Sequence, residues 1–99
     1  MPAGEYSVYL VRCRDGSLYT GIAIDVSRRI AAHEQGTTGA KYLRGKGPLE
    51  LVFQRSVGDR SLAQRVEHRI KRMPRTEKED LQQLPNRIDT LIDEFVKTE

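Results

Sequence analysis

A short turn between two alternating apolar stretches constrains the fold more than any other segment of the chain. The stretches Ser7–Cys13 and Ser17–Ile22 are rich in aromatic and β-branched residues, and the tripeptide Arg-Asp-Gly at 14–16 separates them. Such a pattern is typical of two antiparallel strands joined by a tight hairpin. We therefore expect an antiparallel sheet that begins with this hairpin.

The length of the turn decides which side chains of the two strands share a face. A two-residue loop would place Tyr9 and Tyr19 on opposite faces, because side chains alternate along a strand. A three-residue loop, in which Gly16 adopts the left-handed conformation of a G1 bulge, pairs Val11 with Tyr19 instead. We predict this longer loop, which also pairs Tyr9 with Gly21 and so places both tyrosines on one face.

The residues after the hairpin predict one helix, one long connection and a third strand. Asp25 is a suitable N-cap for a helix that runs to about Gln35 and ends at Gly36. Three residues at helical spacing form one side of this helix: Val26, Ile30 and His33. Four glycines and one proline in residues 36–48 indicate a connection, and residues 49–56 then form the third strand.

Three further helices are expected in the rest of the chain. The second helix starts near Asp59 or Ser61 and stops before Pro74. Its buried stripe consists of Leu62, Val66, Ile70 and Met73. Thr76 and Glu79 have the spacing of a capping box, which predicts a third helix over about 76–84. After Pro85, apolar residues at helical spacing predict a last helix with Asn86 as its cap.

The order strand-strand-helix-strand-helix-helix-helix predicts an α+β fold, a small three-stranded antiparallel sheet flanked by helices. The length of 99 residues suffices for one domain with a modest core. We expect a single domain over 1–99, with its core at about 6–73 and a helical extension at 76–97. The order of the strands within the sheet does not follow from this pattern.

Charge is distributed unevenly along the chain, whose formal net charge is +3. Residues 1–75 carry 14 Lys and Arg against 7 Asp and Glu, whereas residues 76–99 carry 3 against 7. The basic part favours a polyanionic partner such as nucleic acid, although a merely solvated basic surface has the same composition. The acidic C-terminal helices either bind a partner protein or simply cover the core.

Cysteine content and apolar runs indicate the compartment. The single cysteine, Cys13, cannot form an internal disulfide, and no Cys/His cluster has the spacing of a zinc site. Residues 1–5 lack a basic region followed by an apolar stretch, and no apolar run is long enough to span a membrane. We therefore expect a cytoplasmic protein that does not associate with membranes.

Five residues of the hairpin and the helices carry groups that can bind an anion, hold a metal or move a proton: Tyr9, Tyr19, Arg29, His33 and Glu67. Arg29 offers bidentate donors to phosphate oxygens, and Glu67 is a hard oxygen ligand suited to Mg²⁺ or Mn²⁺. Tyr9 or Tyr19 is a candidate general base, a role that requires its pKa to fall well below about 10. His33 could assist either tyrosine or contact the phosphate.

The spacing of these residues resembles that of the GIY-YIG nuclease family. A tyrosine closes the first motif, Tyr19 and Gly21 stand in the second, and a helix then carries Arg29 and His33 four residues apart. Segments 15–22, 39–45 and 67–72 resemble the small stand-alone bacterial members. The first motif departs from the family by reading Ser-Val-Tyr, and Thr20 replaces the usual isoleucine. The late asparagine of some members has no clear counterpart, because Asn86 has the position of a helix cap.

The resemblance implies a nuclease that hydrolyses DNA phosphodiester bonds by direct attack of water, with active-site roles for all five residues. It also implies that Glu67 holds one divalent ion, Mg²⁺ or Mn²⁺. Further residues are candidates for contacts with the nucleic-acid backbone: Lys41, Tyr42, Arg44, Lys46 and Lys71. We expect DNA, ahead of RNA, as the substrate in DNA repair or processing. A non-catalytic nucleic-acid-binding module with the same fold is the alternative.

Each candidate residue also has a purely structural explanation. A strand tyrosine usually packs in the core with a solvated hydroxyl, and His33 lies at the edge of an apolar helix side. Glu67 precedes Lys71 by four residues, the spacing of a surface ion pair, and Arg29 follows Arg28 on a basic helix. Their joint occurrence at the spacing of the family favours a functional site.

Overall fold

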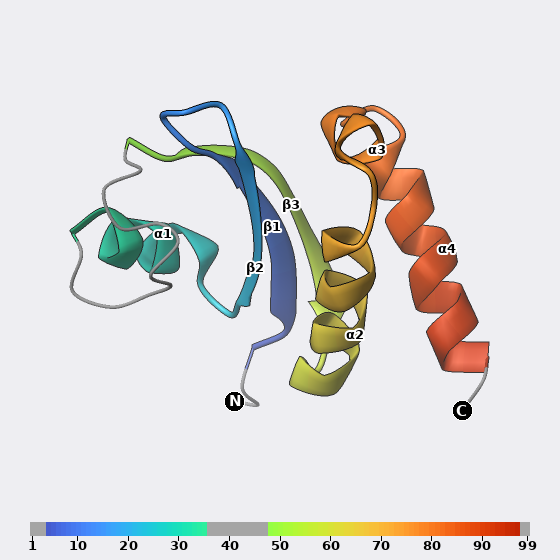
Figure 1. The fold of residues 1–99 in the computed structure, drawn as a ribbon. Coiled ribbons are helices and arrows are strands. Elements are labelled where there is room, and N and C mark those ends of the chain that lie inside the picture. Colours follow the sequence, from blue (N-terminus) through green and yellow to red (C-terminus); the bar gives the residue numbers. More distant parts are fainter. Residues whose placement is uncertain (1–3, 36–47, 98–99) are drawn as a thin grey trace.

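The fold was obtained as a computed structural model that describes residues 4–35 and 48–97 (Figure 1). Seven elements follow in chain order: β1 (Tyr6–Arg12), β2 (Leu18–Ala23), α1 (Val26–Gln35), β3 (Glu50–Gly58), α2 (Arg60–Lys71), α3 (Arg75–Glu79) and α4 (Leu84–Lys97). The predicted order of strands and helices is confirmed. None of the helices in these two ranges combines the length and the apolar character that crossing a bilayer requires.

The three strands form one antiparallel sheet in the order β2-β1-β3. Strand β1 is central, so β2 and β3 are the two edges of the sheet. In Figure 1, α1 covers one face of the sheet, whereas α2 and α4 lie on the opposite side. This arrangement confirms the predicted α+β fold class and supplies the strand order that the sequence pattern left open.

The hairpin between β1 and β2 has the register that the three-residue loop predicts. Tyr9 pairs with Gly21, and Val11 pairs with Tyr19. Gly16 has a φ of 87°, the left-handed conformation that a G1 bulge requires. Because side chains alternate along each strand, Tyr9 and Tyr19 therefore lie on the same face of the sheet.

Alternation along β1 produces two separate cores, one on each face of the sheet. The core on the α1 side consists of Tyr9, Val11, Cys13, Ala23, Val26, Ile30 and Leu49. The core below α2 and α4 consists of Val8, Leu10, Val66, Ile70, Leu84 and Ile88. Each core packs one helical layer against the sheet. Helix α1 therefore covers the face that carries Tyr9 and Tyr19, and α2 covers the opposite face.

Helices α1 and α2 begin at the caps that the sequence predicts. The carboxylate of Asp25 accepts a hydrogen bond from the N–H of Arg28 at 3.1 Å. The carboxylate of Asp59 accepts one from the N–H of Leu62 at 2.9 Å. Each bond satisfies a backbone donor that has no partner inside its own helix. The predicted end of α1 at Gly36, and the connection that follows up to residue 47, lie outside the described residues.

The buried stripe of α2 differs from its prediction. Ala63, Val66 and Ile70 are buried, whereas Leu62 and Met73 are only half-buried. Leu62 lies in the first turn of α2 and Met73 lies beyond its last residue, so both stand at the ends of the helix.

The capping box predicted for the third helix is wrong. Helix α3 begins directly after Pro74, so Thr76 lies inside the helix and does not cap it. The carboxylate of Glu79 instead accepts two hydrogen bonds from the guanidinium of Arg12 on β1, at 2.7 and 3.1 Å. A charge-assisted bidentate pair is stronger than a capping hydrogen bond to a backbone N–H, so the tertiary contact prevails.

The cap predicted for the last helix is also wrong. Helix α4 starts at Leu84, so Asn86 lies within its first turn. Pro85 is tolerated there because the first N–H groups of a helix have no intrahelical acceptor. The backbone oxygen of Asn86 accepts a hydrogen bond from the Thr90 hydroxyl at 3.0 Å, as expected inside a helix.

Candidate active site

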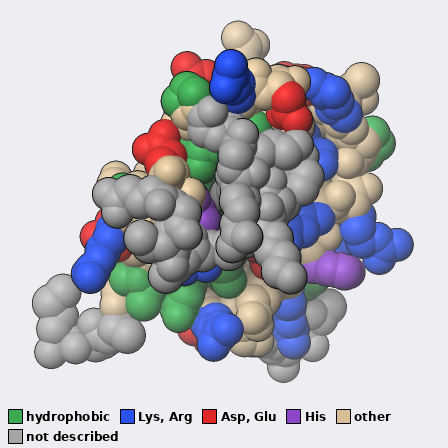
Figure 2. Space-filling model, turned by 60° about the vertical axis from the view of Figure 1, so that its left-hand side comes forward, with side chains coloured by type: hydrophobic (Ala, Val, Ile, Leu, Met, Phe, Trp, Pro, Cys, Tyr) green, Lys and Arg blue, Asp and Glu red, His purple; other side chains and the backbone are tan. Residues whose placement is uncertain are grey.

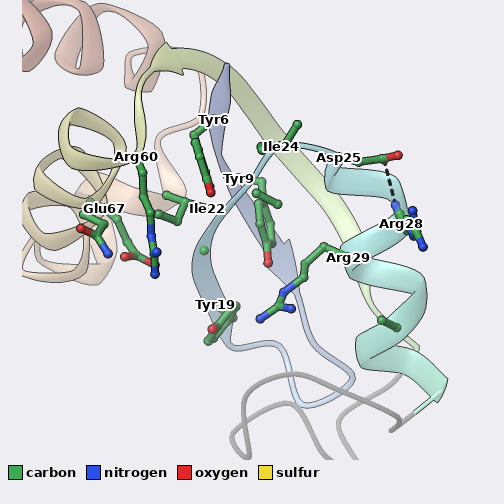
Figure 3. Close-up of a pocket in the computed structure, with 14 residues that line it drawn as sticks. Tyr6, Tyr9, Tyr19, Ile22, Ile24, Asp25, Arg28, Arg29, Arg60 and Glu67 are labelled. Atoms are coloured by element: carbon green, nitrogen blue, oxygen red, sulfur yellow. Dashed lines mark hydrogen bonds between the residues drawn. The ribbon is translucent and has the colours of Figure 1, made fainter. Parts of the chain in front are cut away.

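Four of the five candidate residues line one cavity of about 570 Å³ around the edge strand β2. Tyr9 comes from β1, Tyr19 from β2, Arg29 from α1 and Glu67 from α2, and Figure 3 shows them facing a common space. We call this cavity the tyrosine pocket. Since β2 is an edge strand with helices on both sides, residues from both helical layers reach around it.

Gly21 allows the ring of Tyr9 to cross β2. A Cβ atom at Gly21 would lie only 2.6 Å from both Cζ and the hydroxyl oxygen of Tyr9. Any other residue would therefore displace the ring. The glycine of the second motif thus has a steric purpose, which is to leave room for the tyrosine that pairs with it.

His33 lies behind the two tyrosines and does not line the pocket. Its side chain is buried on α1, and its Nε2 lies 3.4 Å from the hydroxyl of Tyr9. Its ring also meets the ring of Tyr19 edge-on, with centroids 6.1 Å apart. The structure therefore brings His33 to the tyrosines, where it can exchange a proton with Tyr9 but is shielded from a ligand in the pocket.

The pKa of Tyr9 is raised to about 12, mainly by burial and also by the nearby Tyr19. The charge and hydrogen bond of Arg29 act in the opposite direction and lower the pKa, whereas the charge of Glu67 raises it. Near neutral pH the protein groups alone therefore keep the Tyr9 hydroxyl protonated. A general base at this position needs a further positive charge close to the phenol oxygen.

Lys71 accompanies Glu67 at the margin of the pocket. Its Nζ lies 3.5 Å from a carboxylate oxygen of Glu67 and 5.8 Å from the ring centroid of Tyr19. The Glu67 side chain keeps 20% of its surface exposed and that of Lys71 keeps 50%, so both remain accessible to a ligand. The ion pair expected from their spacing is thus present, and it lies beside the tyrosines.

The donors in the pocket suit a hard divalent cation. Glu67 contributes a carboxylate, and Tyr9, Tyr19 and Gln64 contribute neutral oxygen atoms to the same lining. Among residues 4–35 and 48–97, no group of three or more His, Cys, Asp or Glu side chains is arranged to hold a metal. Mg²⁺ needs only one or two carboxylates, because it retains several waters, so this donor set fits it and does not fit zinc.

Several pocket residues were missed by the sequence interpretation: Tyr6, Ile22, Ile24, Asp25, Arg28, Arg60 and Gln64. Arg60 and Gln64 precede Glu67 by seven and three residues, so helical periodicity alone would have placed them on its side of α2. The presence of the other residues in this pocket depends on which strand forms the edge of the sheet, and sequence periodicity does not predict the strand order. Four of the predicted backbone-binding residues lie outside the described residues: Lys41, Tyr42, Arg44 and Lys46.

The surface around the pocket is basic. Figure 2 shows Lys and Arg side chains gathered along the right-hand edge of the face that comes forward, with few acidic side chains among them. Arg28 and Arg29 on α1 and Arg60 on α2 stand on opposite sides of the tyrosine pocket (Figure 3). Three arginines thus face two carboxylates, Asp25 and Glu67, in the described lining, and this excess of positive charge favours an anionic ligand.

A family model described as the GIY-YIG catalytic domain matches residues 5–80, which include every residue that lines the tyrosine pocket. Fold and pocket together thus define a domain of a nuclease superfamily. The chain belongs to the GIY-YIG family, as the resemblance of its motifs predicts.

Similar bacterial proteins carry the name UPF0213 protein. The chain is 50% identical over 86 residues to one from Aeromonas salmonicida, of which it covers 62%, and 54% identical over 77 residues to one from Cronobacter sakazakii, of which it covers 80%. These matches span 87% and 78% of the chain. A solution NMR structure of a UPF0213 protein from Bacillus halodurans has a TM-score of 0.51 at 44% identity, covering 81% of this chain and 84% of that one.

Proposed function

We propose that this chain is a divalent-metal-dependent nuclease that hydrolyses phosphodiester bonds in DNA. The observation that carries the proposal is the convergence of Tyr9, Tyr19, Arg29 and Glu67 on one pocket, although they come from four different elements. Family membership supports a nuclease, and the basic surround supports a nucleic-acid substrate. We further propose a role in DNA repair or processing in the bacterial cytoplasm.

Each residue has a chemical task in this proposal. Arg29 would bind two phosphate oxygens through its planar guanidinium and stabilise the charge that develops on phosphorus. Glu67 would hold one Mg²⁺ or Mn²⁺ ion, releasing Lys71 to contact a neighbouring phosphate. Such an ion supplies positive charge to the phosphate and lowers the pKa of attacking water.

The tyrosines would accept the proton of the attacking water and orient the reacting groups. Tyr9 holds its proton in the protein alone, and the charge of a bound cation would lower its pKa towards the working range. His33, with Nε2 at 3.4 Å, is placed to receive the phenol proton. Tyr19, two residues before Gly21 on β2, would orient the phosphate or the water.

A cleavage assay with matched variants tests the proposal. Purified protein should cut single-stranded, duplex or branched DNA in Mg²⁺ or Mn²⁺ and should be inactive in EDTA. Glu67→Ala and Tyr9→Phe should each lower the rate by about 10²- to 10⁴-fold, the usual contribution of such groups. Glu94→Ala, an exposed carboxylate on α4, serves as the control and should cut normally. Cleavage that persists unchanged in both site variants would refute the assignment.

A non-catalytic nucleic-acid-binding module is the second candidate. Two observations favour it: the pKa of Tyr9 lies at about 12, and Lys71 already neutralises Glu67. Such a module would bind DNA with a steep dependence of affinity on salt but would cut nothing with either metal. Calorimetric titration with Mn²⁺ separates the two candidates, because only the nuclease requires an ion bound through Glu67.

A further inference from the structure

A second pocket, of about 640 Å³, lies between the C-terminal part of α2 and helix α4. Three arginines contribute to its lining, Arg69 and Arg72 from the α2 side and Arg87 from α4, and Leu91 adds an apolar surface. Among the described residues of this lining, Glu77 is the one carboxylate. We call it the α2–α4 pocket. Nothing in the chemistry of the tyrosine pocket requires it.

The exposed arc of α2 connects the two pockets. Successive residues of an α-helix are rotated by about 100°, so the residues of α2 can be ordered around its axis. Starting at Glu67, the exposed side carries Arg60, Lys71, Gln64, His68, Ser61, Arg72, Arg65 and Arg69 in that order. The half-buried Leu62 and the buried Ala63, Val66 and Ile70 complete the circle. We call this exposed arc the basic track.

The basic track is unusually free of negative charge. Glu67 is the only carboxylate in α2, and it lies at the end of the track inside the tyrosine pocket. At the other end, Arg69 and Arg72 reach the α2–α4 pocket. An anion that lies across the width of one helix, about 10–12 Å, would thus meet Arg60 and Lys71 near one pocket and Arg72, Arg65 and Arg69 near the other, with polar side chains between them.

We propose that the α2–α4 pocket binds a backbone phosphate of the same nucleic acid that places another phosphodiester, a few nucleotides away, in the tyrosine pocket. The proposal rests on the proposed function for the class of ligand and adds a second binding site. Guanidinium groups recognise phosphate through paired hydrogen bonds, and the pocket presents three of them from two helices. The continuous basic track favours a strand of nucleic acid over a separate acidic peptide.

Glu77 is the competitor that the phosphate must displace. Its carboxylate lies 3.5 Å from Nη1 of Arg87, a long contact between two partly exposed side chains. Such a pair is weak in water, so a phosphate can replace Glu77 as the partner of Arg87. The α2–α4 pocket is therefore occupied loosely by its own carboxylate and is open to a stronger anion.

Binding of a fluorescein-labelled DNA oligonucleotide to the full chain in EDTA tests the second site. The double variant Arg72→Gln/Arg87→Gln should bind at least about tenfold more weakly at low salt and should flatten the slope of log affinity against log salt by about 1.5 to 2. The control Arg14→Gln/Arg55→Gln removes the same charge outside both pockets, from the exposed Arg14 and from the half-buried Arg55, which pairs with Asp89. Equal effects of the two double variants would overturn the proposal.

Glu77→Gln provides a test with the opposite sign. Removing this carboxylate should tighten DNA binding several-fold, because Arg87 then has no internal competitor. Asp93→Asn, an exposed carboxylate on α4, is the matched control and should have a smaller effect. Equal tightening by both changes would overturn the proposal. So would equally strong competition by poly-glutamate and by DNA of the same charge.

The results of these binding tests can be distinguished from success or failure of the proposed nuclease function. If DNA is never cut but the arginine variants lose binding selectively, the second site stands and the nuclease assignment fails. If DNA is cut and the arginine variants bind and cut like their control, the nuclease stands and the second site fails. When both hold, Arg72→Gln/Arg87→Gln should raise KM and leave kcat nearly unchanged.

Discussion

The side chain of Tyr9 takes its position from the absence of a side chain at Gly21. A Cβ atom at residue 21 would lie only 2.6 Å from both Cζ and the hydroxyl oxygen of Tyr9. Gly21→Ala should therefore destabilise the fold by about 1–3 kcal/mol through overpacking and should displace the Tyr9 hydroxyl from His33. Urea unfolding and the cleavage assay measure the two effects. Normal cleavage by a folded Gly21→Ala protein would contradict this account of the glycine.

The raised pKa of Tyr9 makes stability depend on pH in the alkaline range. In the unfolded chain the phenol ionises near 10, whereas in the fold it stays neutral to about 12. Between these values only the unfolded state loses the proton, so the folding stability contributed by this group is lost as the pH rises from about 10 through 12. Tyr9→Phe should remove this part of the decline, as urea unfolding at several pH values would measure. Identical alkaline profiles would contradict the pKa assignment.

Individual residues of the candidate site could be predicted where a backbone rule fixes their direction. The bulge at Gly16 determines that Tyr9 and Tyr19 share a face, and the loop length alone indicates this bulge. Tyr6 was missed because alternation along β1 assigns it to the face opposite Tyr9, although it lines the same pocket. Sequence periodicity assigns a residue to a face but does not indicate which strand forms the edge.

At the level of elements, hydrogen bonds and ion pairs connect the hairpin turn to helix α3. Arg12 and Arg75 both donate hydrogen bonds to the backbone oxygen of Gly16, at 3.1 and 3.2 Å, and both contact the carboxylate of Glu79. The turn that sets the tyrosine register is therefore held by the nearby Arg12 and by Arg75, which lies 59 residues away from Gly16 in sequence. Local capping rules misread Glu79 because its partner belongs to another element.

This network makes stability depend on pH in the acidic range. The hydrogen bond from Arg12 holds the pKa of Glu79 below its usual value, so the pair stabilises the fold above the unfolded value near 4.5. The contribution is lost as the pH falls through the lowered pKa. Glu79→Gln should lower the melting temperature at pH 7 and should converge with the unmodified protein at strongly acidic pH. The exposed Glu94→Gln is the control, and an equally large effect there would contradict the role of the pair.

The whole molecule places its candidate site at the boundary between two helical layers. Tyr9 and Arg29 belong to the α1 side, Glu67 belongs to the α2 side, and β2 lies between them as the edge strand. Separate cores support the two layers, so the geometry of the site depends on both. The sequence predicts the elements of each layer. The two layers meet at β2 because β1 pairs with β3 on its other side, which leaves β2 at the edge of the sheet. Local sequence patterns do not encode this long-range pairing.

Helix α4 stabilises the α2 layer without reaching the tyrosine pocket. Ile88 is fully buried there among residues that include Val8 and Ile70, and it does not line the pocket. Ile88→Ala should cost about 2–5 kcal/mol of unfolding free energy, because it leaves a cavity in this core. The rate of cleavage per folded molecule should nevertheless stay near that of the unmodified protein at low temperature. Leu51→Ala, at a position 40% exposed, should cost far less. If Ile88→Ala abolished cleavage while urea unfolding still reported a folded protein, α4 would have to take part in catalysis, and the separation of the two layers would be wrong.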